Sequence, residues 1–124
     1  MGHMGRIWVG IGALDALIAV ALAAAGAHAL AARLEGHAGE LFRTALQIQG
    51  WHALALIFCG LWLERAGIVG QLAPIAFLIG SILFCGAVYA LALGDIRLPS
   101  VAPIGGVALM IGWLLLAISA FLRA

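Results

Sequence analysis

Four long apolar runs, separated by short charged breaks, are the feature that most restricts what this chain can fold into. They cover about residues 7–32, 44–63, 72–93 and 101–122. A helix of roughly 20 residues crosses about 30 Å of hydrocarbon, and each run reaches that length. The runs are too long for strands and lack the alternation of polar and apolar residues. The pattern therefore predicts an all-α fold, an integral membrane four-helix antiparallel bundle.

The composition excludes other classes of protein. Of the 124 residues, 66% are hydrophobic and only 9% are charged, and the net charge is +1. A soluble domain of this size has a large polar surface, and about a quarter of its residues are charged. A disordered chain or a nucleic-acid-binding protein needs far more charge. We therefore expect the lipid bilayer as a partner and no nucleic acid.

Residues 1–124 are expected to form a single transmembrane domain. Residues 1–3, before Met4, resemble a cloning remnant, and the first apolar run is too long for a cleavable signal peptide. Pro74 and Pro103 are expected in the first turn of their helices, where a missing N–H costs least.

The arginines do not predict an orientation in the membrane. Three would lie on the side of the termini and three on the other side: Arg6, Arg65 and Arg123 against Arg33, Arg43 and Arg97. The positive-inside rule counts these residues and finds no excess. One fixed orientation and dual insertion with antiparallel dimers both stay open.

Polar residues inside the apolar runs are the candidates for function. Asp15 is the only acidic residue there, and it would cost about 2.5–3.5 kcal/mol at the helix centre if it faced lipid. We expect it to face protein or water. Counted along the helices from the side of the termini, His52 and Ser81 lie at a similar depth to Asp15. The other polar residues of the cluster lie nearer the opposite side of the membrane. The candidate cluster comprises Asp15, His28, Gln49, His52 and Tyr89.

Several interpretations of this cluster stay open. The side chains would satisfy one another and hold the helices in register, as polar groups often do in membranes. They would alternatively form a path for a small solute or for protons. Haem or metal binding through His28 and His52, and catalysis by an Asp15–His52 pair, are further interpretations. Because no nucleophile motif, P-loop or CxxC accompanies them, we expect no cofactor and no enzymatic activity.

Small residues four apart recur along the runs. They are Gly12/Ala16, Ala76/Gly80, Gly86/Ala90/Gly94 and Ala108/Gly112. Such spacing lets membrane helices approach closely. Ordinary packing within the bundle and the contact of a homo-oligomer are both consistent with it.

Several segments together resemble a known family. They are Gly26-Ala27-His28-Ala29-Leu30, His52-Ala53-Leu54-Ala55-Leu56, Leu83-Phe84-Cys85-Gly86, Tyr89-Ala90-Leu91-Ala92-Leu93, Ala102-Pro103-Ile104-Gly105-Gly106 and Gly112-Trp113-Leu114. In this order they resemble the domain-of-unknown-function family 423, small bacterial inner-membrane proteins that include the eukaryotic transmembrane protein 256. The chain departs from the family pattern at Ile48, where an aromatic residue is common, and at Cys85, where serine is common.

The resemblance implies a multi-pass protein of the bacterial inner (plasma) membrane. It brings no established activity, and so no catalytic residue is carried over. It draws attention to six residues, His28, Gln49, His52, Tyr89, Arg97 and Pro103. Gly105 and Gly106 belong to the same motif as Pro103, at the start of the last helix. Our working hypothesis is a membrane structural or interaction protein with a buried polar cluster. The alternative is a small-solute or proton-coupled transport protein, and any small-molecule ligand is unknown.

Overall fold

The computed structural model describes residues 2–122 and consists of helices joined by short connections. In order, these are α1 (His3–Ala27), η1 (Ala31–Leu34), α2 (His37–Trp62), η2 (Leu63–Arg65), α3 (Gly67–Gly94) and α4 (Val101–Leu122), where η marks a short 3-10 helix. The described residues contain no strand. All four α-helices are long and apolar enough to cross a membrane, which confirms the all-helical membrane fold. Arg123, one of the counted arginines, lies outside the described residues.

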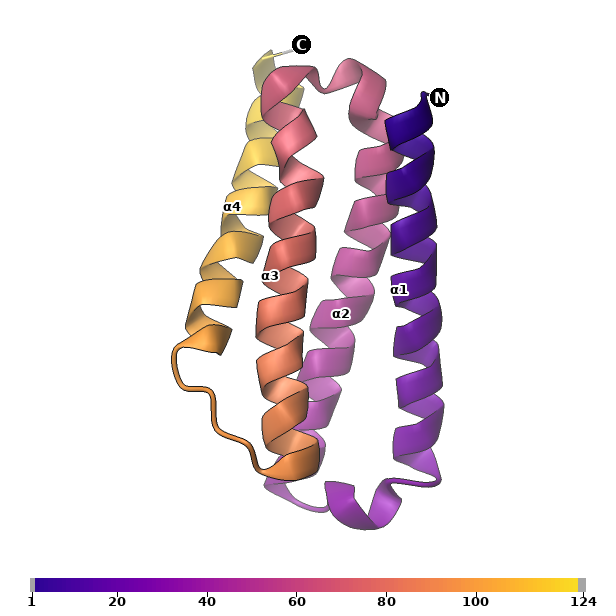
Figure 1. Cartoon of the computed structure of the whole chain (residues 1–124), viewed down its shortest axis with the longest axis vertical. Coiled ribbons are helices and arrows are strands. Elements are labelled where there is room, and N and C mark those ends of the chain that lie inside the picture. The colour runs from indigo at the N-terminus through magenta and orange to yellow at the C-terminus, as the bar shows by residue number, and fades with distance from the viewer. Residues whose placement is uncertain (1, 123–124) are drawn as a thin grey trace.

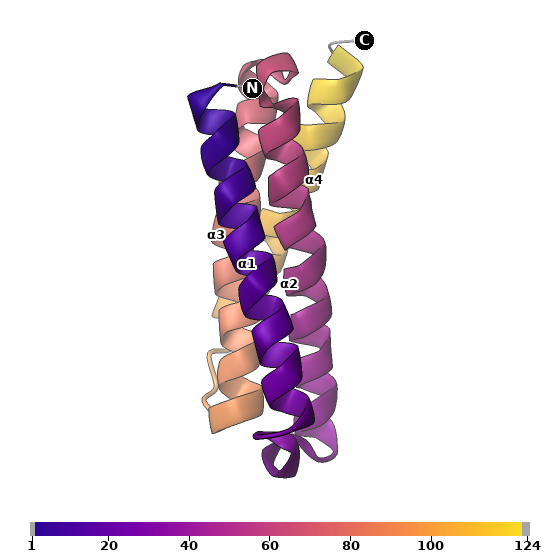
Figure 2. The ribbon, with the colours of Figure 1, turned by 90° about the vertical axis from the view of Figure 1, so that its right-hand side faces the viewer.

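Successive helices run in opposite directions and pack on one another (Figure 1). Both ends of the drawn chain lie at the same end of the molecule, as an even number of crossings requires. The view at 90° places α1 beside α2, with α3 and α4 behind (Figure 2). In the most apolar segment of α2, 44% of the residues are buried, against 11% in α1. Helix α3, which packs against both α2 and α4, follows with 33%. Helices α2 and α3 are therefore the inner pair, and most of α1 faces outward.

Helix α2 begins at His37, earlier than the apolar run suggests. Glu40 and Arg43 lie in its first two turns, because charged side chains at the edge of a membrane are compatible with a helix. Gly36 precedes the helix with φ +63°, a conformation that glycine adopts without steric cost. Apolar run length therefore predicts the membrane crossing better than it predicts the helix ends.

Helix α3 also begins early, and the expected position of Pro74 was wrong. The helix starts at Gly67, after the short η2 turn, so that Pro74 lies inside it. Proline has no N–H for the carbonyl of Gly70, four residues before it. Pro103, by contrast, lies in the first turn of α4, as expected.

Glycines let the helices approach closely within the chain. A Cβ atom on Gly12 of α1 would lie 2.7 Å from the carbonyl oxygen of Ala53 on α2. A Cβ on Gly112 of α4 would lie 2.6 Å from Cδ1 of Phe77 on α3. Both distances are too short for real atoms, and so these small residues serve the internal packing. A Cβ on Gly86 would meet nothing within 4 Å.

Alanine substitutions at two glycines of α1 test this close packing. Gly12→Ala is expected to lower the free energy of unfolding by about 1–3 kcal/mol, because the added methyl group overlaps α2. Gly10→Ala is the matched control, since a Cβ there meets nothing within 4 Å. Alanine favours the helix, so this control is expected to be neutral or stabilising. Unfolding in mixed detergent micelles measures both, and equal losses in the two variants would contradict close packing at Gly12.

Candidate functional site

The side chain of Gln49, near the midpoint of α2, joins three helices. From α2, its Nε2 donates a hydrogen bond of 2.8 Å to Oδ1 of Asp15 on α1. Its Oε1 accepts a hydrogen bond of 2.6 Å from the hydroxyl of Tyr89 on α3. Only 6% of Gln49 is exposed. Three of the candidate residues are therefore brought together in one chain of hydrogen bonds.

The order of these hydrogen bonds decides what the chain can do chemically. Tyr89 donates to an amide oxygen and the amide nitrogen donates to Asp15. An amide holds its two protons on nitrogen and accepts only on oxygen. A proton accepted at Oε1 would not leave readily from Nε2, and the amide interrupts proton transfer from Tyr89 to Asp15. The arrangement suits the fixing of helices better than the conduction of protons.

His52 lies on the same helix but belongs to a separate pair of bonds. Its Nδ1 is 2.6 Å from the backbone oxygen of Ile48. Its Nε2 accepts a hydrogen bond of 2.9 Å from the indole N–H of Trp113 on α4. A carbonyl oxygen can only accept, and so Nδ1 carries the proton and the imidazole is neutral. The rings of Phe77 and Trp113 pack against it, with centroids 5.6 Å away.

The two histidines do not come together. His28 follows the last residue of α1 and is exposed, whereas only 4% of His52 is exposed. Both ring nitrogens of His52 are engaged, so a haem iron or metal would have to displace Trp113. Asp15 is bonded to Gln49 rather than to His52. The geometry therefore does not assemble the His28–His52 ligand pair or the Asp15–His52 catalytic pair.

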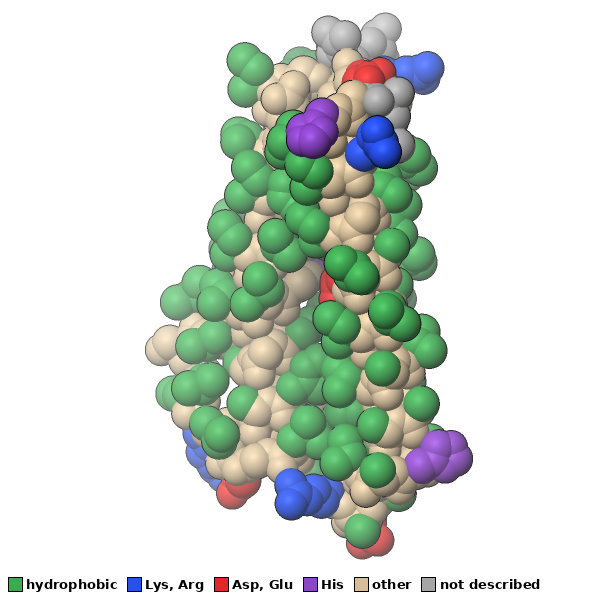
Figure 3. Space-filling view, turned by 45° about the vertical axis from the view of Figure 1, so that its right-hand side comes forward, with side chains coloured by type: hydrophobic (Ala, Val, Ile, Leu, Met, Phe, Trp, Pro, Cys, Tyr) green, Lys and Arg blue, Asp and Glu red, His purple; other side chains and the backbone are tan. Residues whose placement is uncertain are grey.

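A groove of about 430 Å³ opens beside Asp15, between α1 and α3. Its walls are apolar, with Leu14 and Ile18 on α1 and Ile82 on α3 among them. These three side chains are more than half exposed, on a surface that faces lipid in a membrane. Figure 3 shows a mostly apolar face hollowed at mid-height, with an acidic side chain visible inside the hollow.

Ser81 is a functional candidate that the sequence placed at this depth but did not single out. It lines the groove, 6% of it is exposed, and its hydroxyl has no hydrogen-bond partner among the described residues. A serine in a membrane helix usually bonds the carbonyl four residues before it. Oδ2 of Asp15 likewise has no hydrogen bond within residues 2–122. The groove thus holds two polar atoms with unused hydrogen-bonding capacity, which no sequence pattern would have revealed.

The residues of the connecting segment lie away from this cluster. Arg97 is exposed in the connection 95–100 and lines a different hollow at the edge of the bundle. Gly105 lets α4 approach the backbone nitrogen of Phe84, and a Cβ on Gly106 would meet only the ring of that residue. Pro103 therefore belongs to the start of α4 and Gly105 to its packing, whereas the site of Gly106 has room for a Cβ.

Removal of the Gln49 amide tests its role in joining the helices. Gln49→Met is expected to lower the free energy of unfolding by about 1–2 kcal/mol, because Asp15 and Tyr89 then lose their partner. Gln47→Met is the control, since Gln47 is exposed on the same helix. Unfolding in mixed detergent micelles gives both values. If the two variants are equally stable, the hydrogen bonds of Gln49 do not hold the helices.

The pairing of His52 with Trp113 predicts a spectroscopic signature. Nitrogen NMR of the labelled protein is expected to show a neutral His52 protonated at Nδ1. Trp113→Phe should shift the Nε2 resonance and lower the free energy of unfolding by about 1 kcal/mol, because the indole donor is lost. Trp51→Phe, at an exposed position, should change neither quantity. A resonance unaffected by Trp113→Phe would argue against this pair.

Comparison with known proteins identifies the family. Residues 22–106 match the family described as protein of unknown function (DUF423). The chain is 35% identical over 117 residues to the UPF0382 membrane protein SAB0533 of Staphylococcus aureus, covering 94% of this chain and 96% of that one. It is 30% identical over 118 residues to the UPF0382 membrane protein YwdK of Bacillus subtilis, covering 93% and 96%.

The UPF0382 inner membrane protein YgdD of Escherichia coli is 34% identical over 110 residues, covering 87% of this chain and 84% of YgdD. No solved structure matches the chain. The family resemblance of the sequence motifs and the membrane location are thereby confirmed. The chain belongs to the DUF423 family of proteins of unknown function and is a multi-pass protein of the inner membrane.

Proposed function

We propose that this protein is a membrane interaction protein whose groove between α1 and α3 docks a transmembrane helix of another chain. One observation carries the proposal. The groove faces lipid and holds the buried hydroxyl of Ser81, which has no partner among the described residues. In hydrocarbon no water compensates such a group, and leaving it unpaired is costly. A hydrogen-bonding side chain on a docked helix would satisfy it.

The surface of the groove suits a helix. Membrane helices associate through close packing at small residues and through hydrogen bonds between side chains. Gly86 lines the groove and leaves open space for a neighbouring backbone. Asp15 offers a second acceptor through Oδ2, at a similar depth to Ser81. Apolar side chains such as Leu14 and Ile82 flank these atoms and would pack against the apolar side chains of the partner.

The rest of the polar cluster has a structural role in this proposal. Gln49 and Tyr89 use their bonds to hold α1, α2 and α3, and His52 uses both nitrogens on α2 and α4. The transport alternative has less support. The Gln49 amide interrupts proton transfer, and most of the side chains that line the groove are apolar.

Site-specific photocrosslinking in native membranes tests the docking. A photoreactive amino acid at Leu14, on the groove wall, is expected to give an adduct of discrete mass. The same probe at Ala13 is the control, because Ala13 is the exposed neighbour at the same depth and does not line the groove. An adduct of twice the mass of the chain would identify self-association, and another discrete mass would identify a different membrane protein. Equal labelling at both positions, or labelling of lipid alone, would refute docking in the groove.

Ser81→Ala separates docking from folding. The variant is expected to be as stable as the parent or about 1 kcal/mol more stable, because a buried hydroxyl without a partner is removed. The adduct at Leu14 should nevertheless become weaker, since the docked helix loses a hydrogen bond. Stability in detergent and adduct yield in membranes are measured on the same variant. A fall in stability with an unchanged adduct would assign Ser81 to internal structure instead.

A further inference from the structure

A second hollow, of about 490 Å³, lies at the edge of the bundle where α3 passes into α4. Helix α4 starts only at Val101, and Figure 1 shows its first turn well above the lower end of α3. The last turns of α3 and the first turns of α2 are therefore not covered by α4. The connection 95–100 crosses this uncovered surface and forms the rim of the hollow.

The walls of this hollow are apolar. Leu41 comes from α2, Val88 and Leu91 come from α3, and Ala102 comes from α4. In the connection, Ile96 and Leu98 are 55% and 42% exposed. These exposed apolar side chains stand beside the charged Asp95 and Arg97, at the end of a helix long enough to cross a membrane. The hollow thus lies at the boundary between the hydrocarbon and the headgroups.

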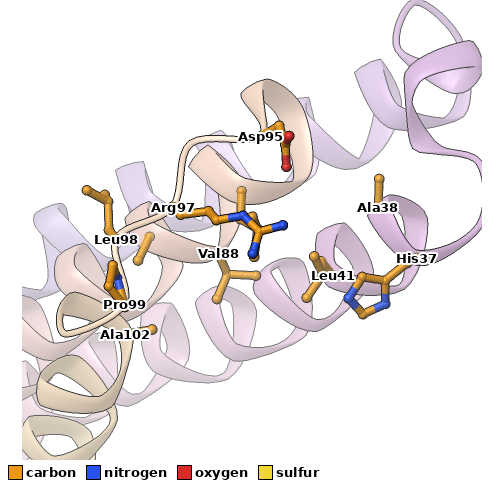
Figure 4. A pocket seen from close by; sticks show the side chains of 11 residues that line it. His37, Ala38, Leu41, Val88, Asp95, Arg97, Leu98, Pro99 and Ala102 are labelled. Atoms are coloured by element: carbon orange, nitrogen blue, oxygen red, sulfur yellow. The ribbon is translucent and has the colours of Figure 1, made fainter.

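Three polar side chains lie around the apolar walls. Figure 4 shows Arg97 reaching from the connection over the hollow, with Asp95 at the end of α3 and His37 at the start of α2. Neither Arg97 nor Asp95 forms an ion pair within residues 2–122, and His37 lies 3.6 Å from Glu40. The site therefore offers one guanidinium and one carboxylate that are free to bind a ligand.

The combination of charges and apolar walls points to one kind of occupant. We propose that the hollow binds a phospholipid whose headgroup carries both a phosphate and a primary ammonium group, as in phosphatidylethanolamine. The guanidinium of Arg97 pairs with the phosphate, for which its planar donors are suited. The carboxylate of Asp95 accepts from the ammonium group, and an acyl chain lies against Leu41, Val88 and Leu91.

The start of α2 adds to the attraction for phosphate. Its N-cap, Gly36, has no side chain to bond the free N–H groups of the first turn, and His37 of that turn lines the hollow. Free N–H groups and the helix dipole favour an anion at this end. The site is independent of the mid-membrane groove, because the two hollows share no lining residue.

Native mass spectrometry of the detergent-purified full chain tests the proposal. Phosphatidylethanolamine and phosphatidylglycerol with identical acyl chains are added in equal amounts. The parent chain is expected to retain one phosphatidylethanolamine about tenfold more strongly, because the glycerol headgroup lacks the cation for Asp95. Equal retention of the two lipids, or preference for phosphatidylglycerol, would overturn the proposal.

Matched variants assign the contacts. Arg97→Gln is expected to retain phosphatidylethanolamine about tenfold less strongly than the parent chain. Arg33→Gln is the control and should retain it as the parent does, because Arg33 is exposed at the same end but outside the hollow. Asp95→Asn should abolish the preference between the two lipids and keep the binding of phosphate. Asparagine tolerates the left-handed conformation of Asp95, with φ 52°, so the connection is preserved. Retention by Arg97→Gln equal to that of Arg33→Gln, or an unchanged preference in Asp95→Asn, would contradict the assigned contacts.

Discussion

The side-chain amide of Gln49 is the interaction on which the arrangement of α1, α2 and α3 depends. Within hydrocarbon no water replaces a lost hydrogen bond, and a polar side chain without a partner is costly. The donor of Gln49 faces Asp15 and its acceptor faces Tyr89. Because α1 packs mainly on α2, this bond, together with the close contacts at Gly12, holds one side of α1 toward the groove. The rotation that pairs Asp15 leaves Leu14 and Ile18 on the groove wall.

The contrast between used and unused polar atoms separates structure from candidate function. His52 satisfies both ring nitrogens, with Ile48 and Trp113, and so connects α2 to α4. The hydroxyl of Ser81 and Oδ2 of Asp15 lack partners among the described residues, and both residues line the groove. At the membrane edge, Arg97 has no ion pair within residues 2–122. The depth of each hollow decides which occupant suits it. The groove between α1 and α3 suits a helix with a hydrogen-bonding side chain, and the hollow at the membrane boundary suits a phospholipid.

The sequence predicted correctly those properties that depend on a single helix. Run length predicted the membrane helices, and the cost of a lone carboxylate in lipid marked Asp15 before any partner was known. It was less accurate where the outcome depends on neighbouring segments. The second apolar run begins at about residue 44, but α2 begins at His37, and Pro74 lies inside α3. His28 was grouped with Gln49 in the candidate cluster but lies exposed beyond the end of α1.

The sequence by itself determined that this chain crosses the membrane, how many times it crosses, and which polar residues the hydrocarbon would have to accommodate. Those properties follow from local composition and helix rise, which need no knowledge of neighbours. Only the tertiary structure decided the pairing: Asp15 with Gln49, His52 with Trp113, and Ser81 with no described partner. Depth along a helix follows from residue number. Which partner a side chain meets depends on how its helix is rotated and how closely the neighbouring helix approaches. Close contacts such as that at Gly12 set the distance between neighbouring helices.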